Sequence, residues 1–163
     1  MLCWVGVGKT TVGRLLAGRL ARPFWDNDEA LAHATGLSAA TFQRERGQSA
    51  LHAIEDSLLR EALGAREPTV LAAAASVVLD PQVLAGAVTV WLRSSAEREA
   101  RNIARSGQRH RPLGADAVVA LRSLSAARQS LYADVADVAI DAASDPVTTC
   151  DAVSVALAAA AAP

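Results

Sequence analysis

The residues best suited to chemistry stand near the start of the chain, in the run Gly6-Val7-Gly8-Lys9-Thr10-Thr11. Glycines allow backbone N–H groups to converge on a phosphate, the Lys9 ammonium reaches the β- and γ-phosphates, and the Thr10 hydroxyl is a ligand for Mg²⁺. Lys9 is also the only lysine in the sequence, which favours a functional over a solubilising role. The run therefore predicts a site for nucleotide phosphates.

This run departs from the complete phosphate-loop pattern at one position. In G-x-x-x-x-G-K-[ST] the first glycine lies five residues before the second, and this chain has Cys3 there. A helical pattern follows over residues 11–21, and only residues 1–5 precede the loop as a candidate strand. The alternative interpretation is a glycine-containing turn before an ordinary helix.

A pair of carboxylates follows the next apolar run, in Phe24-Trp25-Asp26-Asn27-Asp28. The carboxyl ends of parallel strands face the ligand crevice, so Asp26 and Asp28 are expected beside the phosphates. One carboxylate there can hold Mg²⁺ or its waters, and the other can accept hydrogen bonds from a hydroxylated substrate. The alternative is structural, because Asp-Asn-Asp is also typical of a turn or a helix N-cap.

Composition limits the class of protein. With 163 residues, 52% of them hydrophobic, the chain is long enough for one well-packed domain, expected over residues 1–163. A net charge of −1 argues against nucleic-acid binding. Two cysteines are too few for a disulfide framework, and neither a signal peptide nor a membrane span is visible. We expect a cytoplasmic protein, a monomer, with no nucleic-acid or membrane partner.

Strand-like and helix-like segments alternate along the chain, which predicts an α/β fold with a mostly parallel sheet. Residues 38–65 have a helical apolar pattern with a break at Gly47. Besides residues 1–5, four short apolar runs are candidate strands: residues 23–25, 69–74, 88–92 and 135–140.

An arginine-rich segment, SAEREARNIARSGQRHRP, covers residues 95–112. It has few large apolar side chains and ends in proline, which is typical of a mobile charged lid over a phosphate site. We expect such a lid over about residues 95–115. The alternative is a solvated arginine-rich helix.

Seven landmarks in this order resemble the pattern of the shikimate kinase family. They are GVGKTTVGRLLA from residue 6, Phe24 to Asp28, Thr35-Gly36-Leu37-Ser38, Gly47 to Glu55, Ala74-Ala75-Ser76, Arg111-Pro112-Leu113-Gly114 and Arg128-Gln129-Ser130-Leu131-Tyr132. The resemblance implies a three-layer α/β/α fold with a five-stranded parallel sheet of the nucleoside monophosphate kinase type. It also implies that ATP phosphorylates the 3-hydroxyl of shikimate.

The resemblance assigns roles to individual residues. It places ATP phosphates on Lys9 and on the backbone of the loop, Gly6, Val7, Gly8, Thr10 and Thr11. Mg²⁺ is expected on Thr10 and, through water, near Asp26. Lys9, Asp26 and the lid residue Arg111 form the expected catalytic set, with adenine stacked on Arg101 or Arg105. Asp28 and Arg128 are expected to hold the acceptor, a small polyhydroxylated molecule, through its hydroxyls and its carboxylate respectively.

Departures from the family pattern concentrate at the acceptor. The pattern reads G-x-x-x-F-R-x-x-E, and this chain has His52 in place of the arginine. A histidine near neutral pH lacks the fixed charged fork of arginine, and the loss costs about 1.5–3 kcal/mol for a carboxylate substrate. A strand end with three glycines becomes Ala74-Ala75-Ser76, whose Cβ atoms are expected either to crowd the acceptor ring or to reshape the pocket, and are strained wherever φ is positive.

Three hypotheses follow. The first is an active kinase for shikimate or for a related cyclitol without the carboxylate, favoured by the retained loop, acids and arginines. The second is a nucleotide-binding module without catalysis, favoured by Cys3, His52 and the substituted glycines. The third is another phosphate-loop kinase, acting on nucleotides or gluconate, for which the sequence offers no specific signature.

Overall fold

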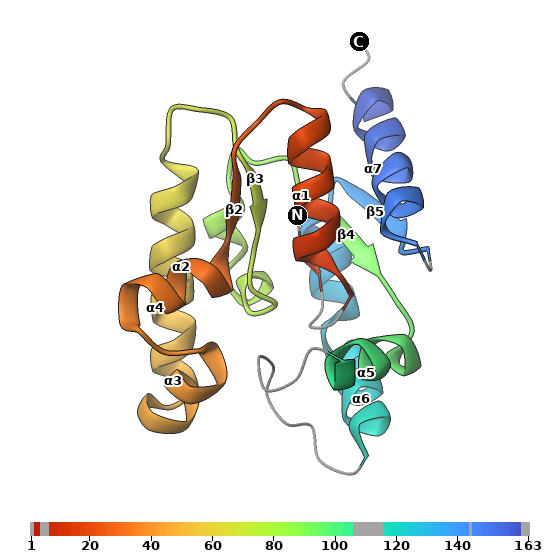
Figure 1. The fold of residues 1–163 in the computed structure, drawn as a ribbon. Helices are drawn as coiled ribbons and strands as arrows, with labels where there is room; N and C mark the ends of the chain where they lie inside the picture. The colour runs from red at the N-terminus through yellow and green to blue at the C-terminus, as the bar shows by residue number, and fades with distance from the viewer. Residues whose placement is uncertain (1, 4–6, 106–115, 144, 161–163) are drawn as a thin grey trace.

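The computed structural model describes residues 2–3, 7–105, 116–143 and 145–160, and helices alternate with short strands throughout (Figure 1). The elements, in chain order, are β1 (Leu2–Cys3), α1 (Lys9–Arg19), β2 (Phe24–Asp26), α2 (Asn27–Thr35), α3 (Ala39–Arg46), α4 (Gln48–Leu63), β3 (Val70–Ala72), η1 (Val77–Leu79), η2 (Pro81–Leu84), β4 (Val90–Arg93), α5 (Ala96–Arg105), α6 (Ala117–Val135), β5 (Val138–Asp141) and α7 (Pro146–Ala160). The predicted α/β alternation is confirmed.

All the described strand pairs are parallel, as expected, but the strands pair in two groups. β1, β4 and β5 form one group in the order β1-β4-β5, and β2 pairs with β3. The described hydrogen bonds therefore do not join five strands into one sheet. The strands are short, and β1 has only two described residues with which to pair.

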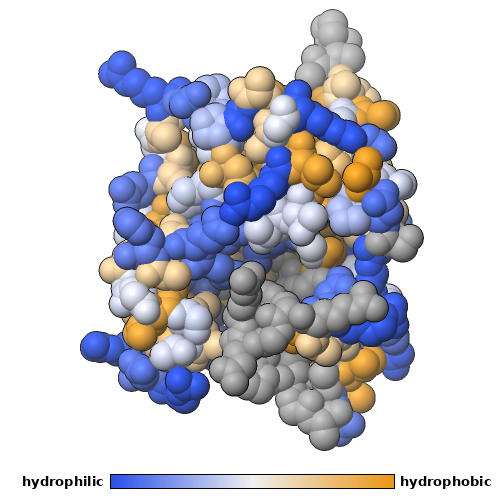
Figure 2. Space-filling model, viewed as in Figure 1, coloured by the Kyte–Doolittle hydropathy of each residue, from blue (hydrophilic) through white to orange (hydrophobic). Residues whose placement is uncertain are grey.

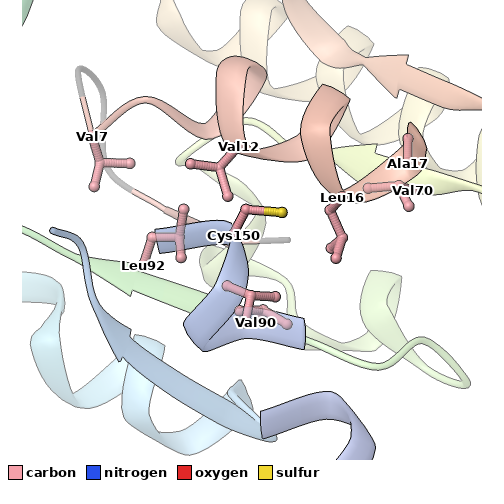
Figure 3. Close-up of a cluster of buried hydrophobic side chains, with 9 residues drawn as sticks. Val7, Val12, Leu16, Ala17, Val70, Val90, Leu92 and Cys150 are labelled. Carbon is pink, nitrogen blue, oxygen red and sulfur yellow. The ribbon is translucent and has the colours of Figure 1, made fainter. Parts of the chain in front are cut away.

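Side chains alternate between two hydrophobic cores along the strands. Val90 and Leu92 of β4 lie in the first core, with Val12 and Leu16 of α1 and Val153 of α7 (Figure 3). Val70 of β3 belongs to the same core. Because successive strand residues point to opposite faces, α1 and α7 cover one face of the strands.

Trp91, between Val90 and Leu92, lies in the second core with Leu59 of α4 and Tyr132 of α6. Its ring stacks on the Tyr132 ring, with centroids 5.5 Å apart. Helices α4 and α6 therefore cover the opposite face of the strands from α1 and α7.

The break at Gly47 is confirmed. Gly47 has φ of 88°, a conformation that L side chains rarely adopt, and it separates α3 from α4. On α4 the buried positions are four residues apart and read Leu51, Glu55 and Leu59. A carboxylate thus lies within an otherwise apolar stripe, at a position that the sequence pattern did not single out as buried.

The predicted lid is a helix over the part that the structure describes. Residues 96–105 form α5. Two of its side chains contact other parts of the chain: Arg98 donates a hydrogen bond of 2.6 Å to the carbonyl of Ala142, and Glu97 forms an ion pair with Arg122 of α6. Helix α5 packs against α6, and the lid over about residues 95–115 stays a prediction. Residues 106–115 lie outside the described part of the chain.

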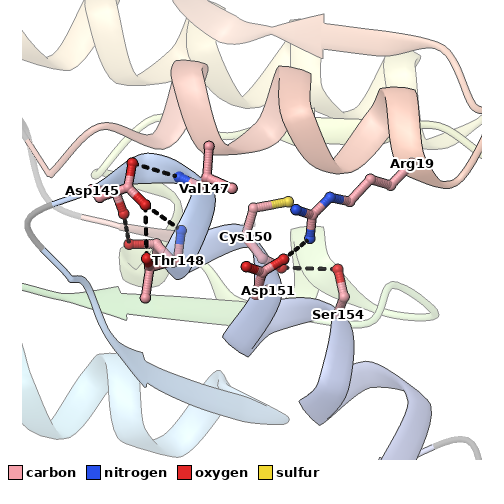
Figure 4. Close-up of polar contacts among 8 residues, drawn as sticks. Arg19, Asp145, Val147, Thr148, Cys150, Asp151 and Ser154 are labelled. Atoms are coloured by element: carbon pink, nitrogen blue, oxygen red, sulfur yellow. Dashed lines mark hydrogen bonds and ion pairs between the residues drawn. The ribbon is translucent and has the colours of Figure 1, made fainter.

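Helix α7 is fixed at its start and along its side. Asp145 accepts hydrogen bonds from the backbone N–H of Thr148 (2.7 Å) and Val147 (3.3 Å), and Asp151 forms an ion pair with Arg19 of α1 (Figure 4). No described helix is both long and apolar enough to span a bilayer. On the face in Figure 2, hydrophobic residues are interspersed with hydrophilic ones, as on most protein surfaces.

Candidate functional site

The N-terminus of α1 has the features of an anion site. Gly8 caps it with φ of 97°, and apart from its neighbours in the chain no atom of the described residues lies within 4 Å of where a Cβ would stand. No acidic residue occupies the first turn, and no side chain caps it. The first backbone N–H groups of a helix lack intrahelical acceptors and carry partial positive charge, so this end of α1 suits a phosphate.

Lys9 begins this helix and is only 8% exposed. Val7 is buried in the first core, Thr10 is partly buried and Thr11 is exposed. Gly6 lies outside the described residues. The described part of the loop therefore presents Lys9 and the backbone of α1, and the Val7 side chain serves packing.

Asp26 joins the two predicted motifs. Its Oδ2 accepts a hydrogen bond of 2.7 Å from the Thr10 hydroxyl, and its Oδ1 accepts from the backbone N–H of Asp28 (2.9 Å) and Glu29 (3.4 Å). One carboxylate oxygen thus caps α2, and the other faces the phosphate loop. For Asp26 the structural and the functional interpretations both agree with the geometry.

Asp28 reaches the same place from the first turn of α2. Its Oδ2 lies 3.9 Å from the Lys9 ammonium, and its side chain is 43% exposed. The two parts of the sequence that carry Lys9 and Asp28 therefore meet, with the carboxylate accessible to a bound molecule. No group of three or more His, Cys, Asp or Glu side chains that suits a metal ion occurs in the described part of the chain.

Glu55 is a site residue for which no role was predicted from the sequence. It is buried on α4, and its Oε2 accepts a hydrogen bond of 2.6 Å from the Ser76 hydroxyl. Burial raises the pKa of Glu55 to about 6, while the Ser76 hydrogen bond and the Lys9 charge act in the opposite direction and the Asp28 charge in the same one. The signal for this residue was a carboxylate between Leu51 and Leu59 on one helix face.

His52 lies one turn before Glu55 on α4. Burial lowers the pKa of His52, and the Arg128 charge lowers it further, with Asp56 acting in the opposite direction. At neutral pH the imidazole is therefore largely uncharged. The predicted replacement of a charged clamp by a neutral group agrees with these surroundings.

The strand end after β3 is held by α6. The carbonyl of Ala75 accepts hydrogen bonds from Arg128 (3.3 Å) and from the Tyr132 hydroxyl (3.0 Å). Neither Ala74 nor Ala75 has a positive φ, since Ala21 is the only such non-glycine residue in the described part. The expected backbone strain at these alanines is absent, because the chain there adopts angles that any residue accepts.

Two further predicted residues cannot be placed. Arg111 lies outside the described residues, and of Arg105 only the backbone position at the end of α5 is described. Arg101, the other candidate for adenine, is exposed on the same helix. The described site therefore consists of the start of α1, the start of α2, one face of α4, the segment after β3 and Arg128 of α6.

Known proteins share both the sequence and the fold. A family model described as "Shikimate kinase" matches residues 5–157. The shikimate kinase of Bordetella pertussis is 34% identical over 151 residues, covering 89% of this chain and 70% of the relative. That of Stenotrophomonas maltophilia is 32% identical over 152 residues, covering 91% and 83%.

A solved structure agrees with these relatives. The shikimate kinase of Acinetobacter baumannii, determined in complex with shikimate, superposes with a TM-score of 0.91 at 25% identity and covers 99% of this chain and 93% of its own. A gluconokinase from Sinorhizobium meliloti superposes with a TM-score of 0.59 at 17% identity, a likeness of fold alone. The match over residues 5–157 and the curated relatives agree: this chain belongs to the shikimate kinase family.

Proposed function

We propose that this protein transfers the γ-phosphoryl group of ATP to the 3-hydroxyl of shikimate, giving 3-phosphoshikimate and ADP. The observation that carries the proposal is the meeting of Lys9 with Asp28 beside the hydrogen bond from Thr10 to Asp26. Phosphoryl transfer depends mainly on positioning and on cationic charge around the phosphate. These four side chains are the types that such a transfer uses.

ATP fits the start of α1. The left-handed Gly8 brings no side chain to the start of α1, where the backbone N–H groups of the first turn and Lys9 can bind phosphate oxygens. We assign the phosphates to this turn and to Lys9, with the backbone of Gly6, Val7, Gly8, Thr10 and Thr11. Arg105 is assigned to the adenine side and Arg111 to the transferred phosphate, both from the family pattern.

Mg²⁺ fits the oxygens of Thr10 and Asp26. A hydroxyl and a carboxylate 2.7 Å apart provide hard oxygen ligands, and Mg²⁺ in phosphoryl-transfer sites keeps water and phosphate oxygens as its other ligands. When bound, the ion neutralises charge on the phosphates.

The acceptor fits between Asp28 and the side chains on α4 and α6. Asp28 is exposed and can accept a hydrogen bond from the reacting hydroxyl, which orients it toward the phosphate. Arg128 supplies positive charge for a carboxylate, and His52 with Ala74 and Ala75 shapes the rest of the pocket. Because His52 is largely uncharged, we expect weaker binding of carboxylate acceptors than an arginine at that position would give.

A second candidate is a nucleotide-binding module without turnover. Cys3, His52 and the alanines after β3 favour it, because each replaces a residue of the family pattern. The unstrained backbone at Ala74 and Ala75 removes one argument for decay of this pocket. We therefore favour the active kinase.

Steady-state ADP release with Mg-ATP separates these candidates. We expect ADP release that depends on shikimate, and slower or no release without an acceptor. A carboxylate-free cyclitol, assayed in parallel, measures how much Arg128 and His52 contribute to recognition of the shikimate carboxylate. ATP binding by calorimetry with no turnover on any acceptor would overturn the proposal and establish the module instead.

The proposal also covers the domain boundaries, the sheet and the oligomeric state. We assign residues 1–163 to one domain in which both strand groups belong to a single five-stranded sheet, with a lid reaching to about residue 115. The shared first core supports this, because Val70 of β3 packs with Val90 and Leu92 of β4. A monomer is expected in the cytoplasm, and sedimentation velocity at assay concentration tests the oligomeric state.

A further inference from the structure

Ser76 and Glu55 form a buried pair next to the acceptor site. Each residue is 7% exposed, and the 2.6 Å hydrogen bond between them joins the segment after β3 to the middle of α4. A buried carboxylate is costly unless it is paired or hydrogen-bonded. The Ser76 hydroxyl supplies such a hydrogen bond to Glu55.

This donor occupies a position where the family pattern has glycine, which has no side chain to donate. The same pattern has arginine three residues before the glutamate, where this chain has His52. Residues three apart on a helix are neighbours on its surface, so an arginine at position 52 would stand within reach of Glu55. The chain thus lacks a cationic donor on one side of Glu55 and has a hydroxyl donor on the other.

We propose that Ser76 is a positioning residue of the acceptor site, whose hydroxyl holds the Glu55 carboxylate in place of the cationic donor that position 52 does not supply. Residues 52 and 76 then act as a coupled pair that sets how the acceptor binds. This inference rests on the proposed kinase function, because it concerns the acceptor of that reaction.

Several charges surround this pair. Lys9 of α1 and Asp28 of α2 both act on Glu55, so the carboxylate belongs to the same electrostatic environment as the reacting groups. Asp56 on the same helix acts on both Glu55 and His52, and Arg128 of α6 acts on His52. An ionised Glu55 therefore contributes its negative charge to the electrostatic surroundings of Lys9 and Asp28.

The hydrogen bond from Ser76 lowers the pKa of Glu55, against the stronger effect of burial. With Ser76 present the pKa of Glu55 is about 6, so the group is mostly ionised at pH 7. Removal of the hydroxyl is expected to raise the pKa of Glu55 and to increase its protonated fraction at neutral pH. A guanidinium at position 52 is expected to reverse this change.

The test uses the full chain and two independent measurements. The first is the ¹³C carboxyl shift of Glu55 against pH in the resting protein, which needs no turnover. The second is KM and kcat for shikimate at saturating Mg-ATP. The variants are Ser76→Ala, Ser76→Gly, each of these combined with His52→Arg, and the control Ser154→Ala, which removes a hydroxyl that donates to a carbonyl within α7.

We expect both Ser76 variants to move the Glu55 midpoint above 6 and to raise KM by roughly tenfold, with little change in kcat. Addition of His52→Arg should return the midpoint, and loss of the Ser76 hydroxyl should raise KM less in the His52→Arg background than in the unmodified protein. Ser154→Ala should change neither the midpoint nor KM. Glycine at position 76 fits any backbone angle there, so it keeps the test valid if the alanine variant folds poorly.

The outcomes separate this inference from the function on which it rests. An unmoved Glu55 midpoint in both Ser76 variants overturns the pairing. A moved midpoint with unchanged KM overturns the role in acceptor binding. Absence of shikimate-dependent turnover in the unmodified protein overturns the proposed function itself, and the acceptor role of Ser76 with it.

Discussion

The phosphate side and the acceptor side of the site differ in what builds them. On the phosphate side the start of α1 offers backbone N–H groups, and two side chains, Thr10 and Asp26, are joined directly. On the acceptor side, side chains from α4, α6 and the segment after β3 form a network that includes Glu55, Ser76, His52 and Arg128. Where backbone N–H groups do the binding, few positions require a particular residue type. Where side chains contact one another, a substitution at one position is expected to accompany a substitution at another.

The largest effect is expected from Lys9→Met on the phosphate side. Loss of the buried ammonium removes charge stabilisation from the transferred group, and kcat should fall roughly 10²–10³-fold. ADP release at saturating substrates measures it. Arg22→Met, at an exposed position between α1 and β2, is the matched control and should retain full turnover. Equal losses in both variants would contradict a special role for Lys9.

Asp26→Asn tests whether the link to Thr10 matters beyond helix capping. Asparagine is also a good N-cap, so α2 should remain, while the charge facing Thr10 is lost. We expect kcat/KM for Mg-ATP to fall roughly 10²-fold. Asp145→Asn makes the same change at the N-cap of α7 (Figure 4) and should leave turnover unchanged. Similar activity in both variants would show that Asp26 is only a cap.

His52→Arg tests the acceptor side. A guanidinium adds a charge-assisted hydrogen bond worth about 1.5–3 kcal/mol, so the KM for shikimate should fall ten- to a hundredfold, with no gain for a carboxylate-free cyclitol. In the unmodified protein, burial and Arg128 keep the pKa of His52 below its ordinary value, so the imidazole supplies little charge for the carboxylate at neutral pH. His33→Arg, at an exposed position on α2, is the control and should change neither acceptor. An equal gain for both acceptors would contradict recognition of the carboxylate at position 52.

The smallest effect concerns Glu99 of α5, which lies outside both sides of the site. Like Glu55 it is a buried carboxylate, but its Oε1 has no hydrogen-bond partner among the described residues, and burial raises its pKa to about 7. Folding raises the pKa of this carboxyl from 4.5 in the unfolded chain to about 7. Its contribution to the free energy of unfolding is therefore fully present below pH 4.5 and is lost as the pH rises through about 7, a change of about 3 kcal/mol.

Glutamine does not ionise, so Glu99→Gln removes this dependence of stability on pH. The buried amide without a hydrogen-bond partner destabilises the variant by about 2 kcal/mol. The variant should therefore be about 1 kcal/mol more stable than the unmodified protein at pH 8, and less stable at pH 5. Urea unfolding at the two pH values measures the difference. A difference that does not change with pH would contradict ionisation of a buried Glu99.

The sequence predicted the features that depend on neighbouring residues. Gly8, Lys9 and Thr10 carry a local phosphate-binding pattern, Asp26 and Asp28 follow a short apolar run, and the structure joins these motifs as expected. The break at Gly47 follows from backbone conformation alone. Each of these features is a property of a few consecutive residues.

Features that depend on contacts between distant residues could not be predicted from the sequence. The contact between Glu55 and Ser76 joins positions 21 residues apart, and only the packing of α4 against the segment after β3 creates it. The expected strain at Ala74 and Ala75 depended on φ angles that no residue type fixes. Residues 96–105 form a helix whose contacts lie on α6, a part of the chain that the segment's own composition does not specify, and the lid over about residues 95–115 stays a prediction.

The most direct test of the account is ³¹P NMR of the unmodified protein with Mg-ATP and shikimate. The account predicts a phosphomonoester resonance that grows together with ADP and requires both shikimate and Lys9. Formation of ADP with inorganic phosphate alone, or a spectrum that does not change while ATP is bound, would contradict phosphoryl transfer to the acceptor.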